Sequence, residues 1–190
     1  MTELERSITS YFGVMEAQKL EVITSFFKPE TVKRGDYFLE TGKRCDKLSF
    51  MKSGLMRIFV ELEKKDITQW ITTKGYFVTD LSSFVFDEPA RWTIQALTDT
   101  EIYTLRKSDY AKLSALVPDW IVLERLFIAR CFTIMENRIF SHLSMTAEER
   151  YAQFFESNKE LFNQVPLQYI ASMLGMTPET FSRIRKKQLQ

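Results

Sequence analysis

The stretch from Trp120 to Leu143 contains neither Gly nor Pro, and it constrains the fold of this chain more than any other feature. Pro118 and Asp119 precede it as signals of a helix start, so we expect one long helix over 119–143. One apolar face is enough for a helix that packs on its own domain, but this helix has two apolar stripes, which indicates a second partner. The first stripe consists of Trp120, Leu123, Phe127, Cys131 and Ile134, and the second of Ile128, Phe132, Met135, Ile139 and Leu143.

Two arrangements account for the second stripe. In the favoured one, the helix packs on a β-domain of its own chain and on the same helix of a second copy, which predicts a homodimer. In the other, the helix is buried between two domains of one chain. The sequence does not decide which stripe meets the copy, and the predicted interface comprises Trp120, Phe127, Ile128, Phe132, Met135 and Ile139.

A series of short apolar segments precedes the long helix, with turn residues about every ten positions. Their alternation of apolar and polar residues predicts an all-β sandwich or roll. Helical spacing indicates one or two short helices over 7–27, and a further short helix over 108–114 capped by Ser108. The expected strands lie in 31–39, 47–51, "SGLMRIFVEL", "DITQWITTKGYF", "RWTIQAL" and "TEIYTL".

Composition excludes several classes of protein. The net charge of +1 over 190 residues means that any nucleic-acid surface must be a local patch. The N-terminus lacks the apolar run of a secretory signal, and the longest uncharged stretch, 161–178, is too polar and broken for a membrane helix. Cys45 and Cys131 are isolated, so we expect no disulfide framework and a cytoplasmic location.

The C-terminal segment "LQYIASMLGMTPETFSRIRKK" predicts two helices joined by a tight turn. Thr146 and Glu149 form a capping-box pattern that opens a preceding helix to about Asn158. Pro166 is expected at the first position of the next helix, and Gly175 ends it. Thr177 then caps the last helix, with Pro178 at its first position. Leu167, Ile170, Ala171 and Leu174 share one face, and Met176, Phe181 and Ile184 can face back toward it, as in a helix-turn-helix.

The last helix leaves polar side chains for solvent or DNA. Arg183 can donate to guanine and Glu179 can accept from cytosine, while hydroxyls and the other cations suit phosphate contacts. The alternative is a solvated last turn whose cations complement the helix dipole. The spacing of Ala171, Gly175, Phe181 and Ile184 favours DNA binding, with predicted contacts from Thr177, Glu179, Thr180, Ser182, Arg183, Arg185, Lys186 and Lys187.

Catalytic and metal chemistry find little support in the sequence. A cupin-type metal site needs clustered His and carboxylate ligands, and the chain has a single histidine, His142. Two separated cysteines cannot hold a four-cysteine cluster, and no haem ligand set, phosphate loop or Ser/His/Asp set stands out. We therefore expect no enzyme activity, no metal and no resident cofactor.

The same C-terminal segment resembles the helix-turn-helix of the Crp/Fnr family of bacterial transcription regulators, whose second helix commonly opens Ser/Thr-Arg-Glu-Thr and continues to a further Arg. Glu179, Thr180 and Arg183 match, whereas Pro178 replaces the first Arg, which predicts an altered operator. The stretch "VKRGDYFLETGKRCDKLSFMKSGLMRIF" is similar to the opening β-roll of the family, with Gly35, Gly42 and Gly54 at its turns.

This resemblance implies an α+β fold. An N-terminal antiparallel β-roll of the jelly-roll type over 1–118 would sense an effector. A dimerisation helix over 119–145 and an all-α helix-turn-helix domain over 146–190 would follow. It also implies a cytoplasmic homodimer that binds palindromic double-stranded DNA and contacts RNA polymerase, without a membrane. Relatives usually add a β-hairpin wing after the recognition helix, and since this sequence stops at Gln190, we expect a trimmed DNA-binding domain.

The second departure concerns the effector. Cyclic-nucleotide binders of the family carry Gly-Glu-Leu and then Arg-Ser/Thr-Ala, which hold the cyclic phosphate. Here Thr79 and Asp80 precede Leu81, and Trp92 follows Arg91, so bulk replaces a small hydroxyl residue and cyclic AMP is disfavoured. The predicted effector pocket comprises Asp80, Leu81, Ser82, Arg91 and Trp92; alternatively, Asp80 and Arg91 pair structurally, and the effector is unidentified or absent.

These observations predict a homodimeric DNA-binding transcription regulator. The main alternative is a β-roll module for regulation or protein interaction whose shortened C-terminal helices do not read DNA.

Overall fold

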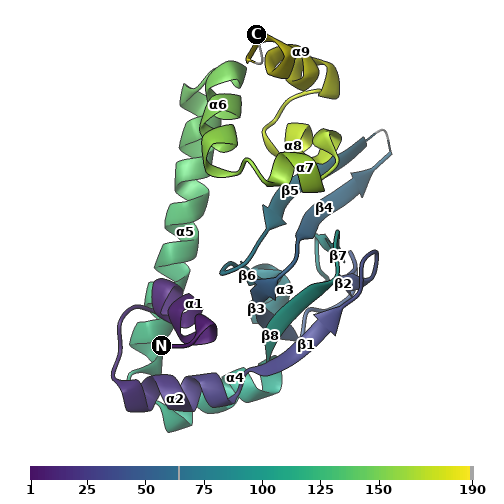
Figure 1. Cartoon of the computed structure of the whole chain (residues 1–190). Helices are drawn as coiled ribbons and strands as arrows, with labels where there is room; N and C mark the ends of the chain where they lie inside the picture. The colour runs from purple at the N-terminus through teal and green to yellow at the C-terminus, as the bar shows by residue number, and fades with distance from the viewer. Residues whose placement is uncertain (64, 189–190) are drawn as a thin grey trace.

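The computed structural model describes residues 1–63 and 65–188, and two antiparallel four-stranded sheets form its β-roll (Figure 1). One sheet has the strand order β1-β8-β3-β6 and the other β2-β7-β4-β5. The predicted α+β class with an antiparallel jelly roll is thereby confirmed. The strands are β1 (Lys28–Val32), β2 (Tyr37–Leu39), β3 (Lys47–Ser53), β4 (Met56–Leu62), β5 (Lys65–Thr72), β6 (Phe77–Val78), β7 (Thr93–Ala96) and β8 (Thr100–Arg106).

Gly54 joins β3 to β4, strands of the two different sheets, at a φ of 85°. A Cβ atom at this position would lie 2.5 Å from the Thr100 hydroxyl oxygen and 2.6 Å from the Asp99 carbonyl oxygen. Only Gly accommodates both the left-handed backbone and this close approach. The sheets are therefore joined at a point where a side chain has no room.

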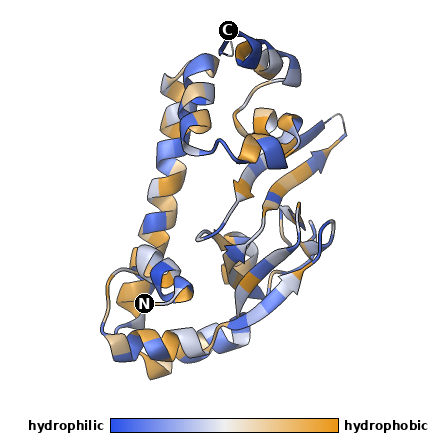
Figure 2. Ribbon diagram, viewed as in Figure 1, coloured by the Kyte–Doolittle hydropathy of each residue, from blue (hydrophilic) through white to orange (hydrophobic). Residues whose placement is uncertain are grey.

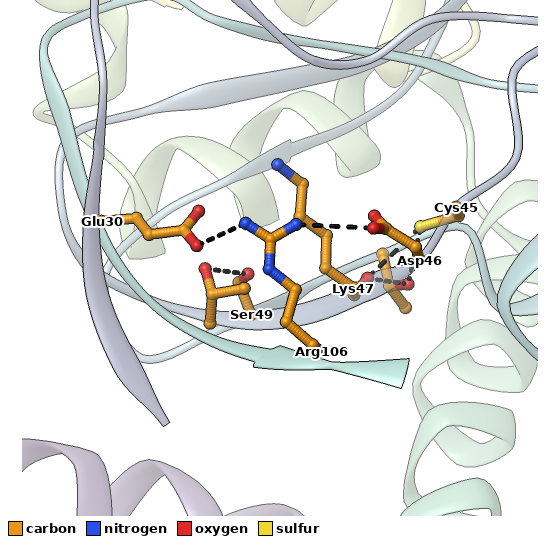
Figure 3. A network of polar contacts seen from close by, with 8 residues as sticks. Glu30, Cys45, Asp46, Lys47, Ser49 and Arg106 are labelled. Carbon is orange, nitrogen blue, oxygen red and sulfur yellow. Dashed lines mark hydrogen bonds and ion pairs between the residues drawn. The ribbon is translucent and has the colours of Figure 1, made fainter. Parts of the chain in front are cut away.

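A polar network fastens one sheet at the end of β8 (Figure 3). The Arg106 guanidinium donates to Glu30 on β1 at 2.8 Å and to Asp46, just before β3, at 3.5 Å. Deeper in the same sheet, the buried hydroxyls of Ser49 and Thr104 lie 2.9 Å apart and satisfy each other. These contacts join three neighbouring strands that are far apart in sequence.

The shorter helices that precede the long helix differ from their predictions in three places: the first begins at Glu3 instead of position 7, the helix over 81–86 was not predicted, and the last begins earlier than predicted. The structure starts α4 at Lys107, with Arg106 at the N-cap and no capping side chain, so the predicted cap at Ser108 is wrong. The reason is that β8 runs directly into the helix, where the Lys107 N–H donates to the Asp46 carbonyl at 2.7 Å. These helices are α1 (Glu3–Phe12), α2 (Ala17–Ser25), α3 (Leu81–Phe86) and α4 (Lys107–Leu116).

The long helix α5 (Trp120–Ser144) runs beside the roll toward the C-terminal helices, as predicted (Figure 1). Its first stripe packs into the core, where Phe12 of α1 stacks on Phe127 with ring centroids 4.8 Å apart. Its second stripe is exposed, so the alternative of a helix buried on all sides within one chain is wrong. Among residues 1–63 and 65–188, no helix is long and apolar enough to cross a membrane.

A second core holds the C-terminal helices together. Tyr151 of α6 (Ala147–Ser157) meets Phe181 of α9 (Pro178–Gln188) edge to face at 5.2 Å, and Phe162 of α7 (Leu161–Gln164) packs on both. The predicted capping box of Thr146 and Glu149 opens α6. Leu189 and Gln190, which end the predicted domain, lie outside the described residues.

Helix α8 (Leu167–Met173) docks on β5, which is an edge strand of its sheet. The Thr68 N–H donates to the Ser172 hydroxyl at 2.9 Å, and the Arg57 guanidinium lies 3.7 Å from the ring centroid of Tyr169. Arg57 is buried and also bonds Thr68 and Asp66. The β4–β5 hairpin thus positions the first helix of the predicted DNA-binding pair.

Helix α5 holds α8 from the other side. Pairing between β4 and β5 shifts so that Gln69 is an extra residue in β5, and the Arg138 side chain donates to its carbonyl. The same guanidinium donates to the Met173 carbonyl at the end of α8, at 3.1 Å. Burial lowers the pKa of Arg138. This side chain joins the roll, the long helix and the C-terminal helices at one point.

Candidate nucleic-acid interface and effector pocket

The turn between α8 and α9 has the geometry that the sequence predicts. Gly175 has a φ of 70°, and the Met176 N–H donates to the Ala171 carbonyl at 2.9 Å. The Thr177 hydroxyl accepts the Thr180 N–H at 3.2 Å and so caps α9. Pro166 occupies the N-cap position of α8 instead of its first position, so the helix begins one residue later than predicted. Two short helices are therefore fixed at their junction by backbone and capping bonds.

Helix α9 buries one face and exposes the other. Phe181 and Ile184 are buried in the second core, as predicted, whereas Thr180 and Arg185 are half-buried. Figure 2 shows hydrophilic residues along this last helix. The exposed side carries most of the residues predicted to contact DNA: Thr177, Glu179, Ser182, Arg183, Lys186 and Lys187.

Glu179 carries the only acidic side chain in the described part of this surface. Its own backbone N–H and the Thr177 hydroxyl hold the pKa of its carboxyl group below the ordinary value. The carboxylate is therefore ionised at neutral pH and lies at the positive N-terminal end of the helix. Positive charge dominates from Arg183 onward, which suits a polyanion approaching along the helix.

A cavity of about 250 Å³ lies between the β-roll and α5. Four of the five predicted effector residues line it: Asp80, Leu81, Ser82 and Trp92. Arg91 does not line it, and its side chain is exposed. The sequence reading missed the aromatic walls, which include Tyr11, Trp70, Tyr76 and Phe77. The aromatic residues of the "QWITTKGYF" stretch could have indicated these walls. Their contact with α1 and α5, however, arises only when the chain is folded and cannot be seen in the sequence.

Helix α5 forms one wall of the cavity. Cys131, Ile134 and Met135 contribute to this wall, and burial raises the pKa of the Cys131 thiol to about 12. The thiol is thus neutral at physiological pH. Met135, a predicted interface residue, is thus also part of the cavity wall.

Asp80 is a structural anion within this cavity wall. One carboxylate oxygen accepts the Ser83 N–H at 3.1 Å, and the other accepts the backbone N–H groups of Arg91 and Trp92 at 3.1 and 3.3 Å. Only 4% of Asp80 is exposed. The alternative in which Asp80 pairs structurally with Arg91 holds through the backbone N–H of Arg91 and not through its guanidinium.

These contacts test whether a cyclic nucleotide fits. A cyclic phosphate needs backbone N–H groups and a cation, but the Asp80 carboxylate already occupies three N–H groups at this site. Among the described residues that line the cavity, there is no Lys or Arg. A phosphate would also lie beside the Asp80 carboxylate, so the residues present do not fit a cyclic nucleotide.

The structure corrects part of the predicted dimer interface. Trp120 is 3% exposed and Phe127 is 1% exposed, because both pack against Phe12 in the core of their own chain. They have no surface to offer a second copy. Ile128, Phe132, Met135 and Ile139 remain exposed and stay predicted interface residues, together with Leu143 from the same stripe.

Comparison with known proteins gives one family match and many matches in fold. Residues 29–115 match the family described as "Cyclic nucleotide-binding domain". A search of curated proteins finds no match for the chain.

Three regulators among the solved structures share the fold over most of the chain. FixK2 from Bradyrhizobium japonicum has a TM-score of 0.70 and 16% identity, and the match covers 85% of this chain and 83% of that one. The c-di-GMP-responsive regulator CLP from Xanthomonas campestris has a TM-score of 0.66 and 14% identity, and the match covers 92% of each chain. The catabolite activator protein of Thermus thermophilus has a TM-score of 0.60 and 18% identity, and the match covers 93% of this chain and 85% of that one. Residues 29–115 thus match the cyclic nucleotide-binding domain family, in a chain with the fold of the Crp/Fnr transcription regulators.

Proposed function

We propose that this protein is a DNA-binding transcription regulator that acts as a homodimer on a palindromic operator. The observation that carries the proposal is the exposed cationic side of α9, set on a buried apolar side that is fixed against α6 and α8. In this arrangement Arg183 reads a guanine, and Lys186 and Lys187 bind phosphates. The assignment of 1–118, 119–145 and 146–190 to effector, dimerisation and DNA-binding units belongs to the same proposal.

The exposed stripe of α5 supports the dimeric form. Phe132 is 67% exposed and Ile139 is 57% exposed, which is an unfavourable state for large apolar side chains that follow one another along a helix. Pairing of two α5 helices covers this stripe and places two copies of α9 on one side of a duplex. Two such helices would enter successive major grooves about 34 Å apart.

The pocket supplies a route for regulation. Because α5 lines the cavity with Ile134 and Met135 and exposes Phe132 and Ile139 alongside, a bound effector can shift the paired helices and re-aim α9. Such regulation requires an effector with different affinity for the two states. Action on chromosomal DNA places the protein in the cytoplasm, where contact with RNA polymerase completes the proposed role.

Selection of binding sites from random duplex DNA tests the function. The purified protein is used for selection, and the selected duplex and a scrambled one are titrated by fluorescence anisotropy at several salt concentrations. We expect a motif with two-fold symmetry, bound at least ~10³-fold more tightly than the scramble. Binding without a motif, with only steep salt dependence, would identify a non-specific polyanion contact and contradict operator reading.

Arg183 provides the residue-level test. Arg183→Ala is expected to weaken binding to the selected site by about 1–3 kcal/mol and to relax preference at one base pair. Arg34→Ala is the matched control, since Arg34 is an exposed cation on a turn of the β-roll. An unchanged preference at every base pair in Arg183→Ala would remove Arg183 from the reading surface.

A further inference from the structure

We propose that the cavity between the β-roll and α5 binds an uncharged, planar aromatic molecule in place of a cyclic nucleotide. The role of this molecule as an effector rests on the proposed function, whereas its binding does not. The inference follows from the bonding of Asp80, the aromatic walls and the size of the cavity.

The Asp80 carboxylate takes the place that a ligand anion would need. Its two oxygens bind N–H groups from both ends of the 83–92 segment, so it also holds the start of α3 against the loop before β7. A second contact fixes this arrangement: the Ser83 hydroxyl accepts the Cys45 N–H at 2.8 Å, in a buried position. An incoming phosphate would have to displace an internal anion that is itself part of the fold.

The charge of the cavity excludes ligand anions and gives no strong attraction to ligand cations. Lys and Arg are missing from the lining within the described residues, so an anion finds no counter-charge. The Asp80 carboxylate accepts three N–H groups, so it attracts a ligand cation only weakly. In addition, the Arg138 guanidinium already lies over the Trp70 ring, at 5.4 Å from its centroid.

The walls suit a flat apolar group. Trp70 and Tyr76 have ring centroids 6.1 Å apart, and both line the cavity with Trp92, Tyr11 and Phe77. Aromatic side chains favour offset-stacked or edge-to-face contact with a further ring. An apolar cavity of about 150 Å³ holds benzene, so the larger volume of about 250 Å³ accommodates one or two fused rings. A polar group such as the Gln69 amide can orient such a molecule.

A series of probes with one ring system and different charge tests the ligand class. Indole is uncharged, tryptamine adds an ammonium group, indole-3-acetate adds a carboxylate, and cyclic AMP represents the phosphate ligand. Binding to the DNA-free protein is measured by ligand-observed NMR and calorimetry. We expect saturable binding of indole, at least ~10-fold tighter than that of either charged analogue, and no binding of cyclic AMP at the same concentrations.

Two variants locate the bound ring. Ile134→Trp fills the cavity from α5 and is expected to abolish indole binding, whereas Thr133→Trp places the same group at the neighbouring exposed position and leaves binding intact. Trp70→Leu removes one aromatic wall and should weaken indole binding about tenfold. Circular dichroism confirms that each variant is folded, and Trp70→Leu suffices if Ile134→Trp does not fold.

Three results would overturn the ligand class: no saturable binding of indole, tighter binding of cyclic AMP or of a charged analogue, or indole binding that neither cavity variant affects. Because the measurements use no DNA, a protein that binds indole but selects no operator would retain this inference and lose the proposed function. A protein that selects an operator but does not bind indole would retain the proposed function and lose this inference.

Discussion

At the residue scale, two buried polar side chains differ in whether their hydrogen bonds are satisfied. Asp80 is satisfied by three N–H groups and is therefore a stable buried anion. Thr72 on β5 is the opposite case: it is buried, and its hydroxyl has no hydrogen-bond partner within the described residues. A buried polar group without a partner is destabilising, so removing the Asp80 carboxylate would leave N–H groups unpaired, whereas keeping the Thr72 hydroxyl lowers stability.

Replacing Thr72 by Val should stabilise the protein. The substitution exchanges a buried hydroxyl without a partner for a methyl group of similar shape, and we expect the free energy of unfolding to rise by about 0.5–2 kcal/mol. Thr100→Val is the matched control, because the Thr100 hydroxyl bonds the Thr98 carbonyl at 2.9 Å and should be destabilising to lose. Thermal denaturation compares the variants, and a lower Tm for Thr72→Val than for the parent would show a hidden partner.

Gly175→Ala should destabilise the turn between α8 and α9. The residue has a φ of 70°, and an added Cβ would lie 3.2 Å from Cδ2 of His142. The left-handed conformation alone costs a non-Gly residue about 1–2 kcal/mol. Gly42→Ala is the control and should lose only this backbone free energy, since nothing lies within 4 Å of its Cβ position at a φ of 84°. A larger loss of Tm for Gly175→Ala measures the His142 contact, and equal losses would mean that His142 moves freely aside.

At the scale of secondary-structure elements, α5 and the β4–β5 hairpin hold the C-terminal helices from two sides. Arg57 is the central contact of the hairpin, because its buried guanidinium stacks between Phe59 and Tyr169 at 4.0 and 3.7 Å from their ring centroids. The position of α9 relative to the roll thus depends on side chains of β4 and α5 and not on covalent linkage alone.

Arg57→Met should loosen α8 from β5. The apolar stem remains, but the stacking on Tyr169, the bond to Thr68 and the ion pair with Asp66 are lost, which we expect to cost about 2–3 kcal/mol. Hydrogen exchange should rise in α8 and stay unchanged in the β1–β8 pair. Arg34→Met, at an exposed turn, is the control. Protection of α8 that equals that of the parent would place the docking energy elsewhere.

Most strands and the longer helices could be predicted from the sequence, because alternation, caps and turn residues act locally, whereas the short helices α3 and α7 were not predicted. Thr146, Gly175 and Thr177 occupy the positions that their side-chain chemistry dictates. One side of the cavity was predicted through the resemblance, at Asp80, Leu81, Ser82 and Trp92. The walls formed by Tyr11, Trp70 and Cys131 could not be predicted, since these residues come from separate segments and meet only after packing. The predicted cap at Ser108 was wrong because a tertiary bond from Lys107 fixes the helix start instead.

At the scale of the whole molecule, the exposed α5 stripe predicts the oligomeric state. Phe132→Glu combined with Ile139→Glu should convert a dimer to a monomer, because two like charges per chain would meet where apolar side chains pack. Val14→Glu with Leu62→Glu introduces the same charges at exposed apolar positions outside α5 and should leave the mass unchanged. Light scattering measures the mass, and a dimer that survives the α5 changes would place the interface on another surface.

Docking of α8 also conceals an open sheet edge. Strand β5 ends its sheet, and its outward backbone groups at Thr68 and Gln69 are taken by Ser172 and Arg138. Release of α8 would free these groups to pair with a strand of another molecule, as exposed edges do. Variants that loosen the C-terminal helices should therefore aggregate while the β-roll is still folded, so that solubility itself depends on the seating of a helix.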